Sequence, residues 1–422
     1  MKSKLFDKLK KLYNNKDVKI LTENFVSLSL LRVVGLLLPL ITLPYVLRVL
    51  GKSNYGIIVL ATTLINYFTA LTDYSFRITA TRDVAINKND KKQLDLIYSN
   101  VLTVRMLFCI LSTIAILLIV LLYKPFRDEI TVFLLTIPML FGYVLFPEWF
   151  FQGIEKMRYI TYLNLGIKTF FTICIFVFIH EANDYWMYPL FNSLGFIGAG
   201  IVGQSMLTRK YKLKYYWIGT KRIKKVLKNN FPIFINQFLP TLYNNTSSFL
   251  LGIMAPTYML GIYDAIKKVV ELFYTLANII AKVFFPFLNR VKTAFNKYKK
   301  AMLIIGVFLT LIPIVSYKLI FWYLDINNSF ALPCLILLSV SVFFFILYDI
   351  FGLNFFIVHN QDKLVMRNTI MASIIGFILA FPLIYYFGII GAALNLVLSR
   401  GIMGLGLTYK YHKSKKIILK NL

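Results

Sequence analysis

The chain has 422 residues, of which 58% are hydrophobic, and it carries a formal net charge of +29. Apolar runs of this number and length exclude a soluble globular protein, and the basic residues alternate between the gaps instead of forming one patch. We therefore expect an all-α polytopic membrane protein that has no nucleic-acid partner.

Residues 1–21 precede the first long apolar run and are rich in lysine. Their apolar side chains recur at helical spacing: Leu5, Phe6, Leu9, Leu12 and Tyr13. Lysines occupy the opposite face: Lys4, Lys8, Lys10 and Lys11. This pattern predicts a helix that lies on the anionic inner leaflet of a membrane. An unstructured basic tail is the alternative.

Twelve apolar runs follow, each long enough to cross a bilayer core of roughly 30 Å, which takes about 20 helical residues. The last two runs are separated only by Phe387-Gly388-Ile389, which we expect to form a tight hairpin. The predicted spans are 22–46, 54–76, 98–122, 129–151, 158–180, 185–207, 230–252, 259–286, 301–324, 329–358, 363–387 and 388–410.

The basic residues predict the orientation of these spans. Thirty-five Lys and Arg residues lie at the termini and in alternate gaps, and the opposite gaps hold only Arg48, Lys52, Lys124 and Arg127. Because cytoplasmic loops carry the excess of Lys and Arg, both termini are expected in the cytoplasm. The gaps on the other side are short and leave no room for an external catalytic domain, so we expect a protein that is not an enzyme.

The longest basic gap, 208–229, lies at the middle of the chain and leaves six spans on either side. Tyr55-Gly56-Ile57 in the first half is echoed by Leu260-Gly261-Ile262 in the second. We therefore predict two parallel six-helix bundles around a central cavity that opens to each side in turn. The predicted domains are 1–21, the bundle 22–207, the linker 208–229, the bundle 230–410 and the basic tail 411–422.

A smaller set of cations lies deep inside the spans, where a charge costs roughly 2.5–3.5 kcal/mol on insertion scales. Arg105, Lys282 and Lys318 lie near span ends, and we expect them to reach the membrane interface. The remaining deep cations are predicted to line the cavity: Arg32, Lys168, Lys267, Lys268 and Arg400. A cationic cavity attracts an anion, and guanidinium groups match phosphate oxygens, so we expect a phosphorylated solute.

Fewer acidic and amide side chains lie at depth. Asp73, Glu271 and Asp349 are candidates for a coupling-ion site or for ion pairs, and Glu271 has Lys267 and Lys268 within reach on the same helix. The amide side chains are candidates for contacts with sugar hydroxyls, or for hydrogen bonds between helices: Asn66, Asn164, Asn236, Asn244 and Asn245. No Cys or His spacing suggests a metal site.

Several strings in residues 25–170 resemble one family. They are Leu43-Pro44-Tyr45-Val46-Leu47-Arg48-Val49-Leu50-Gly51, Asp73-Tyr74-Ser75-Phe76, Thr79-Ala80-Thr81-Arg82-Asp83 and Pro147-Glu148-Trp149-Phe150-Phe151-Gln152-Gly153. Together they are similar to the polysaccharide repeat-unit flippases of O-antigen and capsule gene clusters. That family belongs to the multidrug/oligosaccharidyl-lipid/polysaccharide exporter superfamily.

The resemblance implies a V-shaped transporter of twelve helices in the bacterial plasma (inner) membrane. It would move an oligosaccharide linked to undecaprenyl pyrophosphate between leaflets, with membrane lipids and a glycan polymerase of the same pathway as partners. It implies no cofactor and no catalytic residue, and the coupling ion would be H⁺ or Na⁺. The string with Glu148, Trp149, Gln152 and Gly153 is a candidate gate segment, or else a loop that anchors the protein at the interface.

Three alternatives stay open. The first is an ion-coupled exporter of small molecules with the same fold, and the second is a flippase for a lipid-linked peptidoglycan precursor. The third is a membrane-embedded glycan polymerase or ligase, which the short external gaps disfavour. Neighbouring glycosyltransferase genes would favour the flippase of polysaccharide repeat units.

Overall fold

The computed structural model describes residues 34–35 and 37–420, with the side chains of 236, 240, 242–244 and 414–420 excepted. The predicted amphipathic helix at 1–21 and Arg32 lie outside these residues. The described part of the chain contains helices joined by turns and no β-strand. The helices are α3 (Gly51–Asp73), α4 (Phe76–Ile86), α5 (Lys91–Leu122), α6 (Lys124–Asp128), α7 (Ile130–Leu145), α8 (Glu148–Gly153), α9 (Met157–Phe178), η1 (Ala182–Trp186), α10 (Met187–Ser205), η2 (Met206–Lys210), α11 (Thr220–Met254), α12 (Thr257–Arg290), η3 (Lys292–Ala294), α13 (Phe295–Val315), α14 (Tyr317–Leu324), α15 (Ala331–Tyr348), η4 (Asp349–Ile357) and α16 (Asp362–Lys420).

Nine helical stretches of the described chain are long and apolar enough to span a membrane. Three further segments coincide with other predicted spans, and the number of twelve stays a prediction. They are the apolar helix Leu37–Val49, the 35-residue helix α11, and the second part of α16 beyond a break at Gly388. The prediction of an all-α polytopic membrane protein is confirmed.

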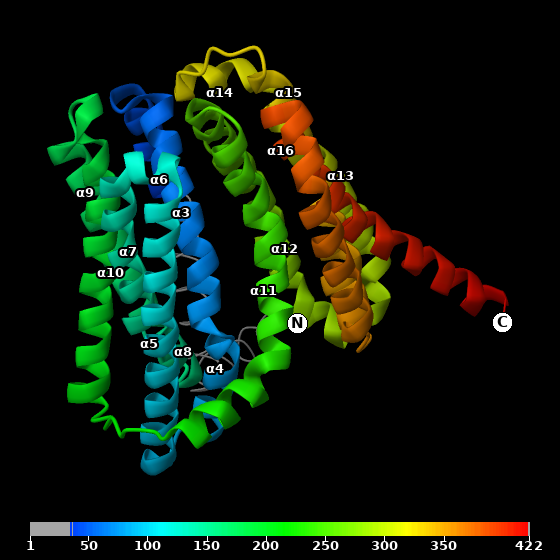
Figure 1. Ribbon diagram of the computed structural model, residues 1–422. Coiled ribbons are helices and arrows are strands. Elements are labelled where there is room, and N and C mark those ends of the chain that lie inside the picture. Colours follow the sequence, from blue (N-terminus) through cyan, green and yellow to red (C-terminus); the bar gives the residue numbers. More distant parts are fainter. Residues whose placement is uncertain (1–33, 36, 421–422) are drawn as a thin grey trace, which may run out of the picture. The chain divides into compact units, whose positions relative to one another are not determined.

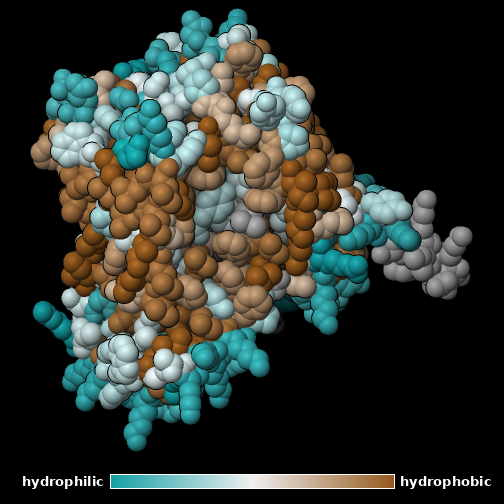
Figure 2. All heavy atoms as spheres, in the orientation of Figure 1, coloured by the Kyte–Doolittle hydropathy of each residue, from teal (hydrophilic) through white to brown (hydrophobic). Residues whose placement is uncertain are grey.

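The outer face of α5 has the pattern expected of a helix in contact with lipid. Leu107, Ile110, Leu111, Ile114 and Leu118 are each at least 40% exposed, and they recur three or four residues apart. In Figure 2, hydrophobic side chains cover the middle stretches of the helices, whereas hydrophilic side chains gather at helix ends. Apolar surface of this extent is stable in a bilayer but not in water.

The helices form two compact units, which we describe separately. Unit 1 comprises Met1–Thr42, Phe68–His180 and Trp186–Phe234, and unit 2 comprises Leu43–Tyr67, Glu181–Tyr185 and Ile235–Leu422. In unit 1, α10 packs against α7 and α9, and α7 also packs against α5 (Figure 1). In unit 2, α15 packs against α12, α13 and α16. The predicted bounds of the two six-helix bundles stay a prediction.

Several of the predicted spans are interrupted in the structure. Tyr74 and Ser75 both have positive φ, at 42° and 68°, and separate α3 from α4. The predicted span 129–151 divides at Pro147, which has no N–H to continue the helix of α7. The predicted hairpin at Gly388 is present: this residue has φ 51°, and Asn368 donates to the Met403 carbonyl across the turn, at 3.0 Å.

The two glycines of the internal echo meet where α3 crosses α12 in unit 2. A Cβ on Gly56 would lie 1.9 Å from the Thr257 carbonyl oxygen, and a Cβ on Gly261 would lie 2.2 Å from the Lys52 carbonyl oxygen. Only a hydrogen atom fits at either position, as at other membrane helix crossings where small residues let two backbones approach. The crossing, in turn, brings Tyr55 to the polar face of α12.

Replacing Gly261 with Ala is expected to lower thermal stability, because the added methyl group overlaps backbone and the two helices must separate. The expected loss is about 1–3 kcal/mol, the usual range for overpacking. Gly166 of α9 is the matched control, since a Cβ there meets nothing within 4 Å. Unfolding temperatures of the two purified variants in detergent provide the test, and equal temperatures would contradict the tight crossing.

Candidate functional site

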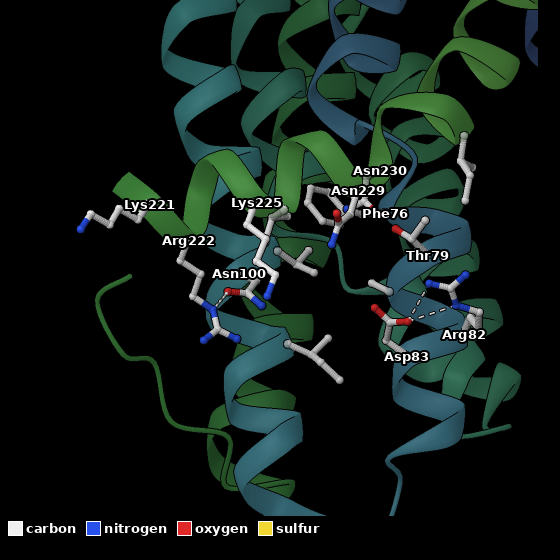
Figure 3. Close-up of a pocket in the computed structure, with 15 residues that line it drawn as sticks. Phe76, Thr79, Arg82, Asp83, Asn100, Lys221, Arg222, Lys225, Asn229 and Asn230 are labelled. Carbon is white, nitrogen blue, oxygen red and sulfur yellow. Dashed lines mark hydrogen bonds and ion pairs between the residues drawn. The ribbon is translucent and has the colours of Figure 1, made fainter. Parts of the chain in front are cut away.

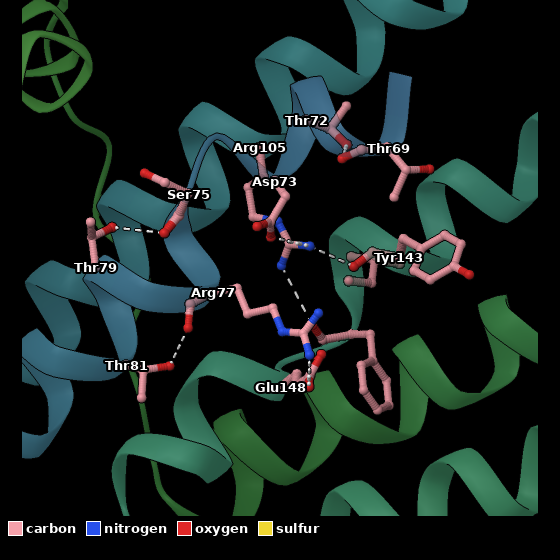
Figure 4. Close-up of polar contacts among 12 residues, drawn as sticks. Thr69, Thr72, Asp73, Ser75, Arg77, Thr79, Thr81, Arg105, Tyr143 and Glu148 are labelled. Atoms are coloured by element: carbon pink, nitrogen blue, oxygen red, sulfur yellow. Dashed lines mark hydrogen bonds and ion pairs between the residues drawn. The ribbon is translucent and has the colours of Figure 1, made fainter. Parts of the chain in front are cut away.

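Arg105 of α5 is the centre of an ionic cluster in unit 1 (Figure 4). Its side chain is only 7% exposed, and its Nη2 lies 3.6 Å from Oδ1 of Asp73 at the end of α3. The guanidinium also donates to two carbonyl oxygens, those of Tyr143 at 2.8 Å and of Phe146 at 3.4 Å. Arg105 therefore joins three segments of unit 1: the α3–α4 break, α5 and the end of α7.

Pro147 explains why the guanidinium lies there. In a continuous helix, the carbonyl of Tyr143 would accept from the N–H of residue 147, but proline has none. Arg105 supplies the missing donor. The expectation that Arg105 would extend to the membrane interface is therefore wrong, because the neighbouring helix offers unpaired acceptors closer by.

Helix α8, which contains the string Glu148–Gly153 from the sequence analysis, packs against α4 beside this cluster. Glu148 lies 3.5 Å from Arg77 of α4, and the carbonyl of Trp149 accepts from the Thr81 hydroxyl at 3.1 Å. Gly153 permits the approach, since a Cβ there would lie 2.8 Å from the Thr81 carbonyl oxygen. Trp149 is buried and Gln152 is half-buried. This segment packs inside unit 1, and its role as a gate or as an anchor stays a prediction.

A second polar cluster lies in unit 2, on one face of α12. We call it the α12 seam, and its side chains recur three or four residues apart: Asp264, Lys267, Lys268, Glu271, Tyr274 and Asn278. The ammonium of Lys268 lies 2.7 Å from Oδ2 of Asp264 and 2.6 Å from the Tyr55 hydroxyl. That hydroxyl also donates to Asp264, at 2.6 Å. The side chain of Lys268 is 38% exposed, so this ion pair is not sealed inside unit 2.

Arg400 of α16 contacts the middle of the α12 seam, at Glu271. It is 3% exposed, its Nη1 donates to the Ser341 hydroxyl at 3.0 Å, and its guanidinium lies 4.8 Å from the centre of the Phe345 ring. Its Nη2 lies 3.7 Å from Glu271, whose side chain is 39% exposed. Glu271 therefore pairs with a buried arginine of another helix, and Lys268 pairs with Asp264. The same-helix pair that the sequence left available to Glu271 is thus replaced by a pair between helices, and a coupling-ion role for Glu271 stays a prediction.

The seam ends at a buried carboxylate. Asp349 is 2% exposed and accepts two hydrogen bonds from the amide of Asn278, at 3.0 and 3.2 Å. The same amide donates to the Tyr274 hydroxyl at 3.1 Å. Asp349 begins η4, a π-helix of the kind that often occurs at functional sites.

The other predicted site residues are spread over both units. The ammonium of Lys168 on α9 lies over Gly35 in unit 1, 2.5 Å from where a Cβ would be. Asn164 donates to the Ile160 carbonyl of its own helix at 2.9 Å. Asn66 and Asn245 are half-buried. Arg32 and the side chains of Asn236 and Asn244 lie outside the described part. The binding roles of all these residues stay predictions.

Tyr55, Arg105 and Asp264 were not among the predicted site residues. Asp264 was visible in the run of alternating charges from 264 to 271, and Tyr55 in the string that the second half echoes. Neither signal gives the pairing, because the contact of Tyr55 with Asp264 joins residues 209 positions apart. Arg105 carried no signal beyond its place inside an apolar run.

Comparison with known sequences gives a family match. Residues 21–292, more than half of the chain, match a family model described as polysaccharide biosynthesis protein. A "Putative O-antigen transporter" of Escherichia coli (strain K12) is 24% identical over 387 residues, which cover 89% of this chain and 93% of the relative. The capsular polysaccharide biosynthesis protein CapF of Staphylococcus aureus is 23% identical over 63% of this chain and 70% of its own length.

Comparison with solved structures gives the fold. The lipid II flippase MurJ in an inward closed conformation has a TM-score of 0.69 and 15% identity, covering 93% of this chain and 87% of that protein. An inward-facing multidrug resistance transporter of the MATE family, in the MOP superfamily, has a TM-score of 0.67 and 13% identity, covering 90% and 98%. The chain thus shares the helical fold of these two proteins.

Proposed function

Because the chain belongs to the polysaccharide biosynthesis protein family, we propose that it flips oligosaccharide repeat units linked to undecaprenyl pyrophosphate. The direction would be from the inner to the outer leaflet of the bacterial plasma membrane. The names of the O-antigen and capsule relatives support this substrate class, and the fold shared with a lipid II flippase supports transport over catalysis. Membrane lipids and a glycan polymerase of the same pathway are the proposed partners.

The observation that carries the proposal is the α12 seam. An apolar spanning helix presents two lysines, and one of them is held by Tyr55 and Asp264 while more than a third of its side chain stays exposed. Charge-assisted hydrogen bonds to phosphate are among the strongest that a protein makes. We propose that Lys267 and Lys268 contact the pyrophosphate, with Arg400 as an anchor beneath, while the prenyl tail stays in lipid. Arg32 and Lys168 are proposed as further cationic contacts to the same substrate.

We propose cytoplasmic termini for this protein. The 35 Lys and Arg residues of the alternate gaps and termini support this orientation. Two basic gaps of unit 1 meet at one end: Lys156 lies 5.5 Å from the centre of the Tyr211 ring, and Lys210 lies 4.6 Å from that of Tyr159. At this end, the cations would face the anionic inner leaflet.

Energy coupling is proposed to use a carboxylate at membrane depth. Glu271 is the favoured site for H⁺ or Na⁺, because it lies one turn from the proposed pyrophosphate contacts and is 39% exposed. Asp73, paired with Arg105, and the buried Asp349 are the other candidates. Acidic residues in membrane spans commonly serve as such sites. We propose no cofactor.

The second candidate function is flipping of a lipid-linked peptidoglycan precursor, which the fold shared with MurJ favours. An ion-coupled exporter of small molecules is the third, supported in the same way by the MATE transporter. Both have the same helical fold as the proposed flippase, so fold alone does not separate them. Substrate chemistry separates the exporter from the two flippases, since only the lipid-linked substrates carry a pyrophosphate on a prenyl chain. The two flippases differ only in the head group on that pyrophosphate.

Purified protein in liposomes is expected to move a defined undecaprenyl-pyrophosphate oligosaccharide across the bilayer under an imposed H⁺ or Na⁺ gradient. Cleavage of the exposed head group by an impermeant glycosidase measures the movement. Empty liposomes provide the background, and a peptidoglycan precursor lipid in the same assay tests the second candidate. Transport of the precursor but not of the oligosaccharide would overturn the proposal.

A further inference from the structure

Unit 1 contains a cavity that the proposed transport path does not use. It lies among α4, α5 and the first turns of α11 and has a volume of about 530 Å³ (Figure 3). Volumes of this size are typical of sites for small organic ligands. Its polar lining includes Arg82, Asp83, Asn100, Arg222 and Lys225.

The electrostatics of this cavity favour an anion. Arg82 and Asp83 neutralise each other on α4, with Nη2 and Oδ1 3.0 Å apart. The cations from α11 then remain in excess, and Figure 3 shows Arg222 and Lys225 extending from α11 toward α5. Nothing acidic in the lining besides Asp83 opposes them.

One of these cations is already oriented. The Nε of Arg222 donates to Oδ1 of Asn100 at 2.8 Å, which holds the plane of the guanidinium. Within the described part of the chain, its Nη1 and Nη2 make no hydrogen bond, so they form a free fork. A planar fork of two N–H groups matches two oxygens of a phosphate.

The same turns of α11 border an apolar groove on their other side. Thr220, Ile223 and Lys224 line this groove together with Leu107 of α5 and Trp217, and its volume is about 600 Å³. Trp217 is 81% exposed, and exposed tryptophans next to apolar helices gather at the membrane interface. The basic cavity therefore lies at the depth where lipid head groups are found.

We propose that this cavity binds the phosphate of an anionic phospholipid head group. Arg222 and Lys225 contact the phosphate oxygens, and Asn100 positions Arg222. The polar remainder of the head group fits beside Asn229. An acyl chain extends from the cavity along the apolar surface that the protein presents at the membrane interface. The site does not depend on the proposed transport activity, because head-group binding requires no turnover.

The experiment measures binding of dihexanoyl phosphatidylglycerol to the purified full chain in detergent, by thermophoresis. In the variant Arg222→Gln/Lys225→Gln, we expect its affinity to fall at least tenfold, equal to about 1.4 kcal/mol. The control Arg209→Gln/Lys228→Gln removes one arginine and one lysine of unit 1 outside the cavity and is expected to bind within twofold of the unchanged chain. Dihexanoyl phosphatidylcholine, which has no net charge, should bind more weakly than phosphatidylglycerol.

A second variant keeps the test open if the double variant does not fold. Asn100→Asp places a carboxylate against Arg222 and should weaken phosphatidylglycerol binding while leaving α11 unchanged. Equal loss of binding in the control variant would overturn the proposal, since general attraction to positive charge would then suffice. Inorganic phosphate or glycerol 3-phosphate binding as tightly as the lipid would overturn the assignment to a phospholipid.

Discussion

Replacing Lys267 and Lys268 together with Ala is expected to abolish surface glycan while the protein remains in the membrane. Each lysine is proposed to donate to the pyrophosphate, and a hydrogen bond to a charged group contributes about 1.5–3 kcal/mol. Loss of both should weaken substrate binding by well over tenfold. Glycan extracted from the cell surface, compared with the amount of protein in isolated membranes, measures the effect.

Two controls separate substrate binding from stability. Lys292→Ala/Lys297→Ala removes the same charge at exposed positions of η3 and the first turn of α13 and should leave surface glycan unchanged. Lys268→Ala/Asp264→Asn removes the lysine together with the carboxylate that it would leave unpaired, and glycan should still fall. Normal glycan in the Lys267→Ala/Lys268→Ala variant would refute the role of the α12 seam in substrate binding.

Replacing Arg105 with Met is expected to destabilise unit 1 strongly. Asp73 would lose its counter-ion, and the carbonyl of Tyr143 would lose the donor that replaces the missing N–H of Pro147. Removing one partner of a buried ion pair costs about 3–5 kcal/mol. The unfolding temperature in detergent, followed by tryptophan fluorescence, should fall by roughly 5 °C.

The partner substitution tests the physical cause. In Arg105→Met/Asp73→Asn, the carboxylate is replaced by a neutral amide, so part of the lost stability should return. Arg105→Lys keeps the charge but not the fork that reaches two carbonyl groups, so its stability should lie between those of the unchanged chain and Arg105→Met. An unchanged unfolding temperature for Arg105→Met would mean that the cluster contributes nothing to stability.

The spans were predictable because the bilayer imposes a length and a composition on every helix that crosses it. The hairpin at Gly388 was predictable too, since no other residue between the last two runs favours a positive φ. The break at Tyr74 and Ser75 was not, because neither side chain favours that conformation. Contacts between distant residues surround it instead: the Tyr74 ring stacks on those of Phe108 and Phe234, and Asp73 pairs with Arg105.

The sequence predicts most of the charged residues of the α12 seam, but it does not predict which of them form ion pairs with each other. Insertion energy alone identifies Lys267, Lys268 and Arg400 as charges that must face protein or water. The acidic partner of each cation depends on how α12 packs against α3 and α16. That packing joins residues far apart in the sequence, so the local sequence does not predict the partner. Lys268 therefore pairs with Asp264 one turn before it, instead of with Glu271 one turn after.

The crossing of Gly56 and Gly261 has a bearing on how the chain arose. Lys52 is four residues before one glycine and Thr257 four residues before the other, so each helix presents the same position to its counterpart. That reciprocity is the signature of an isologous interface, in which position i of one copy meets position j of the other and the reverse. If the halves descend from one duplicated segment, that segment once paired with itself here, as a homodimer. In that case one glycine position would have supplied both close approaches that Gly56 and Gly261 now share.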